Sequence, residues 1–289
     1  MSAIYERELD SQLNGLTGYL YGAFMLLFAG VYVMAYNLAG YTEFTYVVFS
    51  MTFILVAAIP MLTMRSIAEE RRQGTDKLLY SLPISMTKIV LGKYLALVTV
   101  MAMPMAVMCL YPPIISAVAT SGVMPMKSAY GAMLGFFALG AALTAVGLFI
   151  SSLMENVGLA AGACFGAMLL IYFLTPLTGY IASTAMASLI GFTVVAALLG
   201  FVTWRMTGSG RLALILGGIG EAIVLLCFLL FRQSFGGLFA KALGMLAIFD
   251  RFDNFAYDIF DMTGLVYFAS VAAVFLFLTV QVMERRRWA

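Results

Sequence analysis

The sequence predicts an all-helical polytopic membrane protein with about eight transmembrane spans and both termini in the cytoplasm. Three observations lead to this fold class. Of the 289 residues, 63% are hydrophobic and only 10% are charged, whereas soluble domains are roughly 45–50% apolar and about 25% charged. The mean hydropathy is +1.02. The 16 basic and 14 acidic residues are interrupted by long stretches that carry no charge. A helix of about 20 mainly apolar residues can cross the bilayer.

The gaps between charged residues define the expected spans in order. They are residues 16–36, 44–64, a third span between Lys93 and Lys127, a fourth between Lys127 and Glu155, two spans between Glu155 and Arg205, residues 212–231 and residues 264–283. Pro104 is expected to kink the third span. Residues 156–204 carry no charge and are too many for one span, so we expect a break near residues 175–179, which include Pro176.

The placement of basic residues supports an even number of spans. With both termini inside, the cytoplasmic side would carry twelve basic residues: Arg7, Arg65, Arg71, Arg72, Lys77, Lys88, Lys93, Arg205, Arg211, Arg285, Arg286 and Arg287. The other side would carry four: Lys127, Arg232, Lys241 and Arg251. This excess agrees with the rule that short cytoplasmic loops are rich in Lys and Arg.

The residue types present exclude several classes of catalytic site. There is no histidine, which removes His-based triads and imidazole metal sites. The three cysteines, Cys109, Cys164 and Cys227, lie singly in apolar runs, so neither disulfides nor a metal site are expected. No phosphate-binding GxxxxGK[ST] loop and no aspartate pair within a span occurs. We therefore expect a chain that is not an enzyme, binds no cofactor, metal or nucleic acid, and draws energy from a partner or an ion gradient.

Three segments of the single expected domain, residues 1–289, lie outside the spans. Residues 1–15 have the apolar periodicity of a short helix along the cytoplasmic interface. Residues 65–88 form the longest cytoplasmic insertion. Residues 235–260 place large apolar side chains three and four positions apart, which predicts extracytoplasmic interfacial helices rather than a ninth span.

The cytoplasmic segment 65–88 allows two interpretations. It extends the second span to Gly74, and Thr75 then caps a short helix that Pro83 ends, with Asp76 at its positive end. By composition it is a solvated juxtamembrane loop. The apolar face formed by Leu78 and Leu79 instead suits docking to a soluble subunit.

Four runs resemble one family of transport proteins. Residues 59–79, IPMLTMRSIAEERRQGTDKLL, resemble the passage from second helix to coupling helix in ABC-2-type transporter permeases. Residues 89–96 (IVLGKYLA) resemble the beginning of that family's third helix, and residues 147–156 (GLFISSLMEN) the turn after its fourth. The C-terminal run 266–288 is similar to the gliding-motility-associated branch. Residues 182–231 depart from the usual six-span plan as a two-span insertion.

The resemblance implies an architecture, partners and contacts. The chain would be the permease subunit of a type V exporter-like ATP-binding-cassette (ABC) transporter in the cytoplasmic membrane. Its partners would be membrane lipid, two cytoplasmic ATPase subunits that hold ATP and Mg²⁺, a second permease copy in a homo- or heterodimer, and an extracytoplasmic auxiliary protein. The implied ATPase contacts are Glu69, Glu70, Arg71, Arg72, Gly74, Thr75, Asp76, Lys77, Leu78 and Leu79. Two other classes stay open, an ATPase-independent secondary transporter and a membrane scaffold for an extracytoplasmic partner.

The spaced glycines and Glu221 each allow two interpretations. Glycines four residues apart, Gly158, Gly162 and Gly166, and likewise Gly131 and Gly135, allow close helix approach, either within the chain or in a permease dimer. Glu221 is the only ionisable residue deep in an expected span. It is either a pathway or gating group, or a neutral carboxyl hydrogen-bonded to a neighbouring span.

Overall fold

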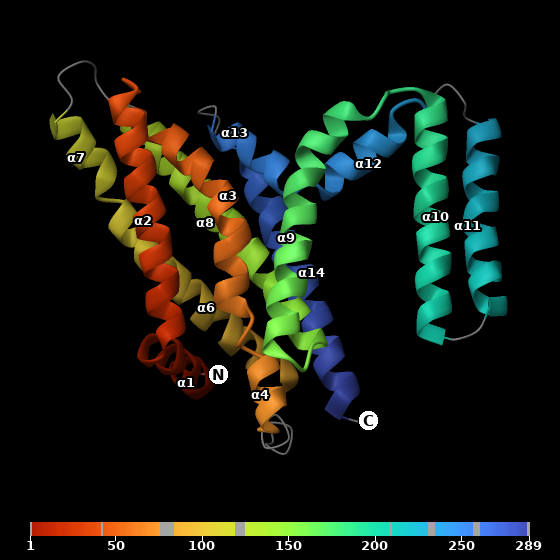
Figure 1. Ribbon diagram of the computed structural model, residues 1–289, viewed down its shortest axis with the longest axis horizontal. Coiled ribbons are helices and arrows are strands. Elements are labelled where there is room, and N and C mark those ends of the chain that lie inside the picture. The colour runs from red at the N-terminus through yellow and green to blue at the C-terminus, as the bar shows by residue number, and fades with distance from the viewer. Residues whose placement is uncertain are drawn as a thin grey trace. The chain divides into compact units, whose positions relative to one another are not determined.

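The protein is helical throughout its described part. The computed structural model describes residues 2–41, 43–75, 84–118, 125–207, 210–230, 235–256 and 261–287, and every regular element in these ranges is a helix (Figure 1). The helices are α1 (Ser2–Asn14), α2 (Leu16–Leu38), α3 (Phe44–Thr63), α4 (Ala68–Gln73), α6 (Met86–Met108), α7 (Tyr111–Val118), α8 (Met126–Leu153), α9 (Val157–Tyr180), α10 (Ala185–Thr207), α11 (Gly210–Leu230), α12 (Leu238–Leu246), the 3-10 helix η1 (Phe249–Phe252), α13 (Asp253–Ala256) and α14 (Met262–Arg287). The all-helical fold class is confirmed.

Six segments of the described ranges are long and apolar enough to cross a membrane. They are Leu16–Leu38, Phe44–Gln73, Met86–Ala117, Met126–Leu153, Val157–Tyr180 and Met262–Arg287. Helices α10 and α11 occupy the two remaining expected spans, but their described parts give only the shorter apolar helices Ala185–Ala197 and Gly218–Leu230. The chain is therefore an integral membrane protein with several spans.

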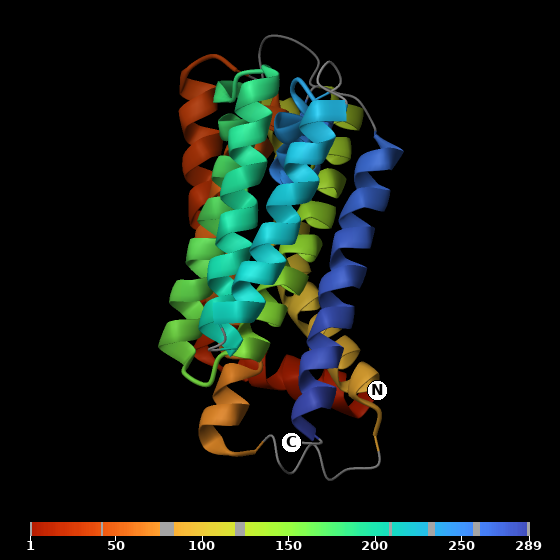
Figure 2. The ribbon, with the colours of Figure 1, turned by 90° about the vertical axis from the view of Figure 1, so that its right-hand side faces the viewer.

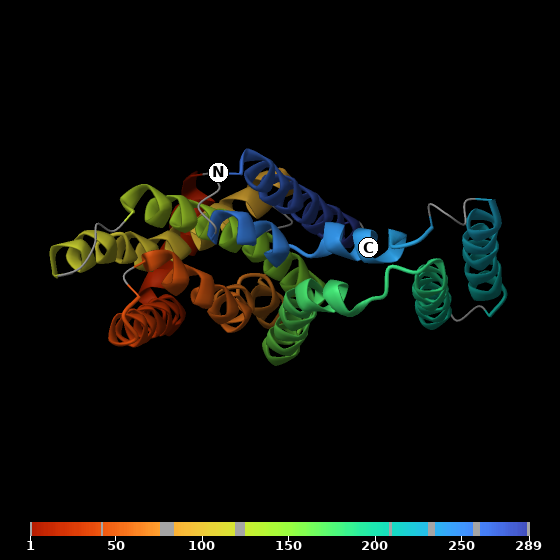
Figure 3. The same cartoon turned by 90° about the horizontal axis from the view of Figure 1, so that it is seen from above.

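The chain divides into two compact units: unit 1, Met1–Tyr172 with Arg251–Ala289, and unit 2, Phe173–Asp250. In unit 1, α3 and α8 are the most buried spans. Seen from above, α8 lies between α3 and α14 and packs against both (Figure 3). Gly147 of α8 meets the Thr63 side chain of α3, because a Cβ at Gly147 would lie only 2.5 Å from Thr63 Oγ1. Small residues at such crossings let two helix backbones approach closely.

Two of the expected spans have different ends in the structure. The third span begins at Met86, before Lys93, and runs through Pro104. It is interrupted at residues 109–110, and Pro112 lies in the first turn of α7, where proline is tolerated because the first backbone N–H groups have no partner in the helix. The break expected near residues 175–179 comes a few residues later, since α9 continues through Pro176 to Tyr180 and α10 begins at Ala185.

One end of unit 1 gathers α1, α4 and the last turns of α8 and α14, and we call it the α4 end. Figure 2 shows α1 lying across the ends of the spans and α4 projecting beyond them. Arg286 of α14 pairs with Glu155 at 3.5 Å and donates to the Leu153 carbonyl at 3.3 Å. Helix α13 lies at the opposite end, against α3 and α8 (Figure 1). The first and last described helices, α1 and α14, thus both reach the α4 end.

Unit 2 contains the whole of the expected two-span insertion, residues 182–231. Helices α10 and α11 pack as a hairpin, and α12 packs on α10. The Phe239 ring of α12 lies directly over Gly191, where any larger residue would collide with it. Phe192 contacts both Phe235 and Phe239, with ring centroids 5.8 and 5.2 Å apart. The aromatic side chains of α12 therefore pack closely on α10 at Gly191.

Candidate functional site

The short helix α4 is fixed to unit 1 by a serine of another helix. The turn 64–67 separates α3 from α4, so the expected continuous extension of the second span is broken there. Ser151 of α8, which is buried, accepts hydrogen bonds from the backbone N–H groups of Ile67 at 3.4 Å and Ala68 at 3.2 Å. It also donates to the Met64 carbonyl at 3.3 Å. Ser151 thereby satisfies N–H groups that a helix start leaves unpaired, a role that no side chain of α4 fulfils.

A buried ion cluster joins α4 to α1 and α6. Lys93 of α6 is only 1% exposed. Its Nζ lies 2.7 Å from Glu8 Oε2 of α1 and 2.9 Å from Glu70 Oε1 of α4, and it donates to the Ser66 carbonyl at 2.9 Å. These three acceptors match the three donors of an ammonium group. We call Lys93, Glu8, Glu70 and Ser66 the ionic junction.

Arg7 of α1 balances the charges of the ionic junction. Arg7 donates to Glu70 Oε1 at 2.7 Å, and the Ser66 hydroxyl donates to Glu8 Oε1 at 3.1 Å. The two cations Lys93 and Arg7 therefore face the two carboxylates of Glu8 and Glu70. Glu8 also accepts the hydrogen bond from Ser66. A buried charge is tolerated only when it is paired and hydrogen-bonded in this way. The junction consequently requires α1, α4 and α6 to hold one arrangement.

Helix α1 is fitted against α6 beyond this cluster. A Cβ at Gly92 would lie 3.1 Å from Ile4 Cγ2, so α1 packs at van der Waals distance over a glycine of α6. The Tyr5 hydroxyl and Thr99 Oγ1 form a hydrogen bond of 3.0 Å. The helix expected at residues 1–15 is present, and its inward face contacts protein.

The coupling residues expected from the sequence have different surroundings. Glu69 pairs loosely with Arg65 at 3.8 Å and Arg72 at 3.6 Å, and its side chain is 30% exposed. Glu70 faces inward, into the ionic junction. Arg71 donates to the Met154 carbonyl at 3.4 Å.

Helix α4 ends at Gly74 as expected, whereas the short helix that Thr75 was expected to cap lies outside the described residues. Gly74 adopts a left-handed conformation with φ +68°, a position that favours glycine at a helix end. Thr75 Oγ1 donates back to the Glu70 carbonyl at 3.2 Å. Asp76, Lys77, Leu78 and Leu79 lie outside the described residues.

The glycine pairs separate into packed and open positions. A Cβ at Gly135 would lie 2.6 Å from the Phe255 ring, so Gly135 serves packing within unit 1. Gly131, Gly162 and Gly166 have no described neighbour within 4 Å of such a Cβ, and Gly158 meets only Asn156 of its own turn. The buried stripe of α9 lies on another face, at Ala160, Cys164 and Met168.

Glu221 has a partner on the neighbouring helix. Thr193 of α10 donates to Glu221 Oε1 at 3.0 Å, within unit 2. The side chain is partly buried. This hydrogen bond to a neighbouring helix is the geometry expected for the structural alternative.

The comparison with protein families decides the identity of the scaffold. A family profile described as ABC-2 family transporter protein matches residues 3–206, which is 204 of the 289 residues. The chain belongs to the ABC-2 transporter family. A comparison with curated proteins returns no match. The match covers α1, α4, α6 and α8, so the ionic junction lies within the family region of this ABC-2 protein, which is a membrane component of an ABC transporter.

Sequence analysis did not identify Lys93, Glu8 and Ser151 as members of a site. Lys93 was interpreted as the boundary of a span, and Glu8 was given no role of its own. Two signals were present. Glu8 lies among Ile4, Tyr5 and Leu9, within the stripe that was expected to be apolar. Lys93 follows Lys88 by five residues, inside an otherwise apolar run.

Proposed function

We propose that this ABC-2 protein is the permease subunit of an ABC exporter and couples ATP hydrolysis by a separate ATPase to translocation across the cytoplasmic membrane. One observation carries this proposal: α4 is clamped between buried partners on α1, α6 and α8. A force applied to α4 would therefore reach three helices at once, and rigid helix groups that rotate together are a common basis of alternating access.

The topology proposed is eight spans with both termini in the cytoplasm. The α4 end of unit 1 carries basic residues from α1, α4, α6 and α14, which supports a cytoplasmic location by the positive-inside rule. The α10–α11 hairpin would supply the two additional spans. Helices α12 and α13 would then both belong to the extracytoplasmic segment 235–260.

The proposed complex contains two copies of the ATPase, which hold ATP and Mg²⁺, and a second permease copy. The chain itself would be a transport subunit without a catalytic site. The open glycine face at Gly162 and Gly166 is a candidate contact for the second copy, because small residues allow close helix approach. Assignment to the gliding-motility-associated branch, with an extracytoplasmic partner, is part of the proposal and is supported by the C-terminal run.

Glu69 is the residue that tests the proposed ATPase contact. Because Glu70 belongs to the ionic junction, its reversal would disturb folding and docking together. The described side-chain contacts of Glu69 are instead the long ion pairs above and a hydrogen bond from Gln73 at 3.2 Å. We expect Glu69→Lys to insert and fold normally. Like-charge contacts at an interface cost several kcal/mol, so ATPase association should weaken at least about tenfold.

The measurement is ATPase binding and transport-coupled ATP hydrolysis by the purified complex. Glu155→Lys is the matched control, because Glu155 also lies at the α4 end and its side chain is 78% exposed. Unchanged coupling in Glu69→Lys, or equal loss in both variants, would contradict the docking assignment.

A further inference from the structure

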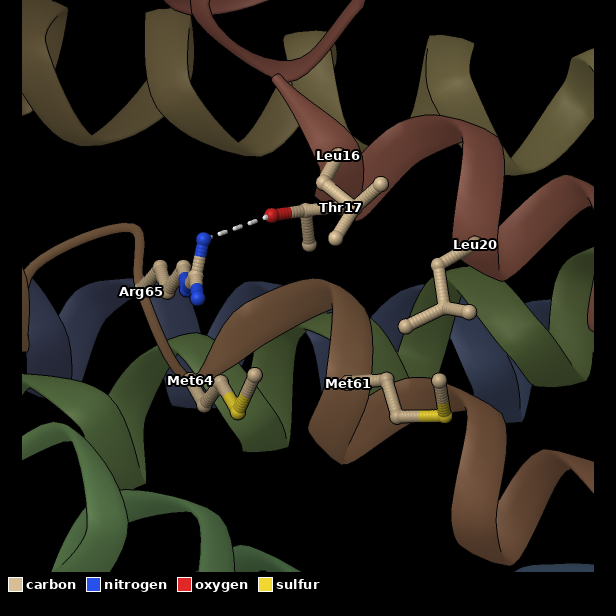
Figure 4. Close-up of a pocket in the computed structure, with 6 residues that line it drawn as sticks. All are labelled: Leu16, Thr17, Leu20, Met61, Met64 and Arg65. Atoms are coloured by element: carbon tan, nitrogen blue, oxygen red, sulfur yellow. Dashed lines mark hydrogen bonds between the residues drawn. The ribbon is translucent and has the colours of Figure 1, made fainter.

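A cleft between α2 and α3 lies at the α4 end of unit 1 (Figure 4). Its volume is about 40 Å³, and it is lined by Leu16, Thr17, Leu20, Met61, Met64 and Arg65. In Figure 4, Leu20 and Met61 extend toward one another across the cleft, and Arg65 reaches from the end of α3 toward Thr17 at the start of α2. The lining is thus apolar along most of its length and polar at one end.

The cleft is open to the surroundings of unit 1 on the α2 side. Leu16 is 75% exposed and Leu20 is 49% exposed. Both are large apolar residues at the first turns of a span, where the helix enters the lipid. An apolar ligand could therefore reach the cleft laterally from the bilayer.

The Arg65 guanidinium has spare capacity to bind an anion. Its side chain is 48% exposed, and its partners are distant: Thr17 Oγ1 at 3.4 Å and Glu69 Oε2 at 3.8 Å. Glu69 is shared with Arg72, at 3.6 Å. Among the described residues, two guanidinium groups thus share one carboxylate, which leaves a net positive charge beside the cleft.

We propose that this cleft binds an anionic glycerophospholipid of the leaflet at the α4 end. The headgroup phosphate would accept hydrogen bonds from Arg65 and Thr17, and the first carbons of one acyl chain would lie between Leu20 and Met61. Arginine binds phosphate oxygens through charge-assisted hydrogen bonds. Basic groups between helices near the membrane surface favour anionic lipids by the same chemistry.

The dimensions of the cleft determine which part of the lipid gives selectivity. A cleft of about 40 Å³ holds only a short part of one chain, so every phospholipid would gain similar apolar contact. The headgroup charge is then the feature that distinguishes one lipid from another. This inference requires only that the chain lies in a membrane, and it does not depend on the ATPase.

The test compares lipids on the full-length chain by native mass spectrometry. The purified protein is titrated with phosphatidylglycerol, with phosphatidylcholine of the same acyl chains, and with glycerol 3-phosphate as the headgroup alone. A basic residue near the surface contributes about 1 kcal/mol toward anionic lipid, so we expect about fivefold tighter binding of phosphatidylglycerol. Glycerol 3-phosphate should not displace it at equal concentration.

Variants assign the preference to this cleft. Arg65→Gln should abolish the fivefold preference and Arg65→Lys should keep most of it. Lys88→Gln is the control, because Lys88 is an exposed basic residue that neither lines the cleft nor pairs with Glu69, and it should keep the preference. Equal binding of both lipids by the unaltered chain, equal loss in Arg65→Gln and Lys88→Gln, or displacement by glycerol 3-phosphate would each overturn the proposal.

Discussion

Replacing Lys93 by methionine is expected to destabilise the folded chain by about 3–5 kcal/mol, the usual effect of removing one partner from a buried ion pair. Methionine fills a similar volume but leaves Glu8, which is 7% exposed, without its cation. Glu70 would retain Arg7 at 2.7 Å. We therefore expect a large fall in the midpoint of thermal unfolding in detergent, together with faster proteolysis of α1.

A matched control and a double variant isolate the ionic junction. Lys88→Met changes an exposed lysine of the same helix and should shift the unfolding midpoint little. Glu8→Gln in the Lys93→Met background should recover part of the loss, because it removes the uncompensated carboxylate. If Lys93→Met unfolds like Lys88→Met, the buried cluster does not hold these helices together.

Gly147→Ala is expected to have the second largest effect, about 1–3 kcal/mol of destabilisation. The added Cβ would lie 2.5 Å from Thr63 Oγ1 and 3.0 Å from Thr63 Cβ and Cγ2. Thr63 is fully buried, and its hydroxyl donates to the Ile59 carbonyl, so it has little freedom to turn aside. Helices α3 and α8 would have to move apart, and they form the centre of unit 1.

The chain supplies both a control and a rescue for this prediction. Gly131→Ala lies on the same helix with no described atom within 4 Å of the new Cβ, so its unfolding midpoint should stay level or rise slightly. Thr63→Ala removes two of the three colliding atoms and should restore part of the stability of Gly147→Ala. Equal midpoints for Gly147→Ala and Gly131→Ala would show that the α3–α8 approach is not limiting.

The spans could be predicted from sequence because lipid imposes a simple requirement. A helix that crosses the bilayer must be apolar over its whole length, and charge-free runs therefore located α2, α3, α8, α9 and α14 closely. Helix ends were less accurate where proline was involved. Pro176 was expected to break a helix and lies inside α9, since a single missing N–H in a membrane helix can be accommodated.

The ionic junction could not be assembled from sequence because its members are far apart in the chain. Lys93 and Glu8 are separated by 85 residues. A lysine in an apolar run also has an ordinary explanation as a span boundary, so the position of Lys93 did not by itself indicate a buried ion pair. Its burial follows from α1 folding back across the spans, which local periodicity does not specify.

The role expected for Glu70 illustrates the same limit. The resemblance placed Glu69 and Glu70 together as ATPase contacts. Adjacent residues of a helix point about 100° apart, and here one faces outward while the other enters the junction. The sequence therefore predicted the segment but not which of its acids is available to a partner.

Co-purification in native lipid is the most direct test of the central claim, that this ABC-2 chain works as a permease with a separate ATPase. The full chain would be extracted gently into nanodiscs, and its partners would be identified and quantified by mass spectrometry. The account predicts an ATPase subunit in equal amount to the permease, with reduced recovery in Glu69→Lys and normal recovery in Glu155→Lys. Recovery of the chain without an ATPase under several extraction conditions would contradict it.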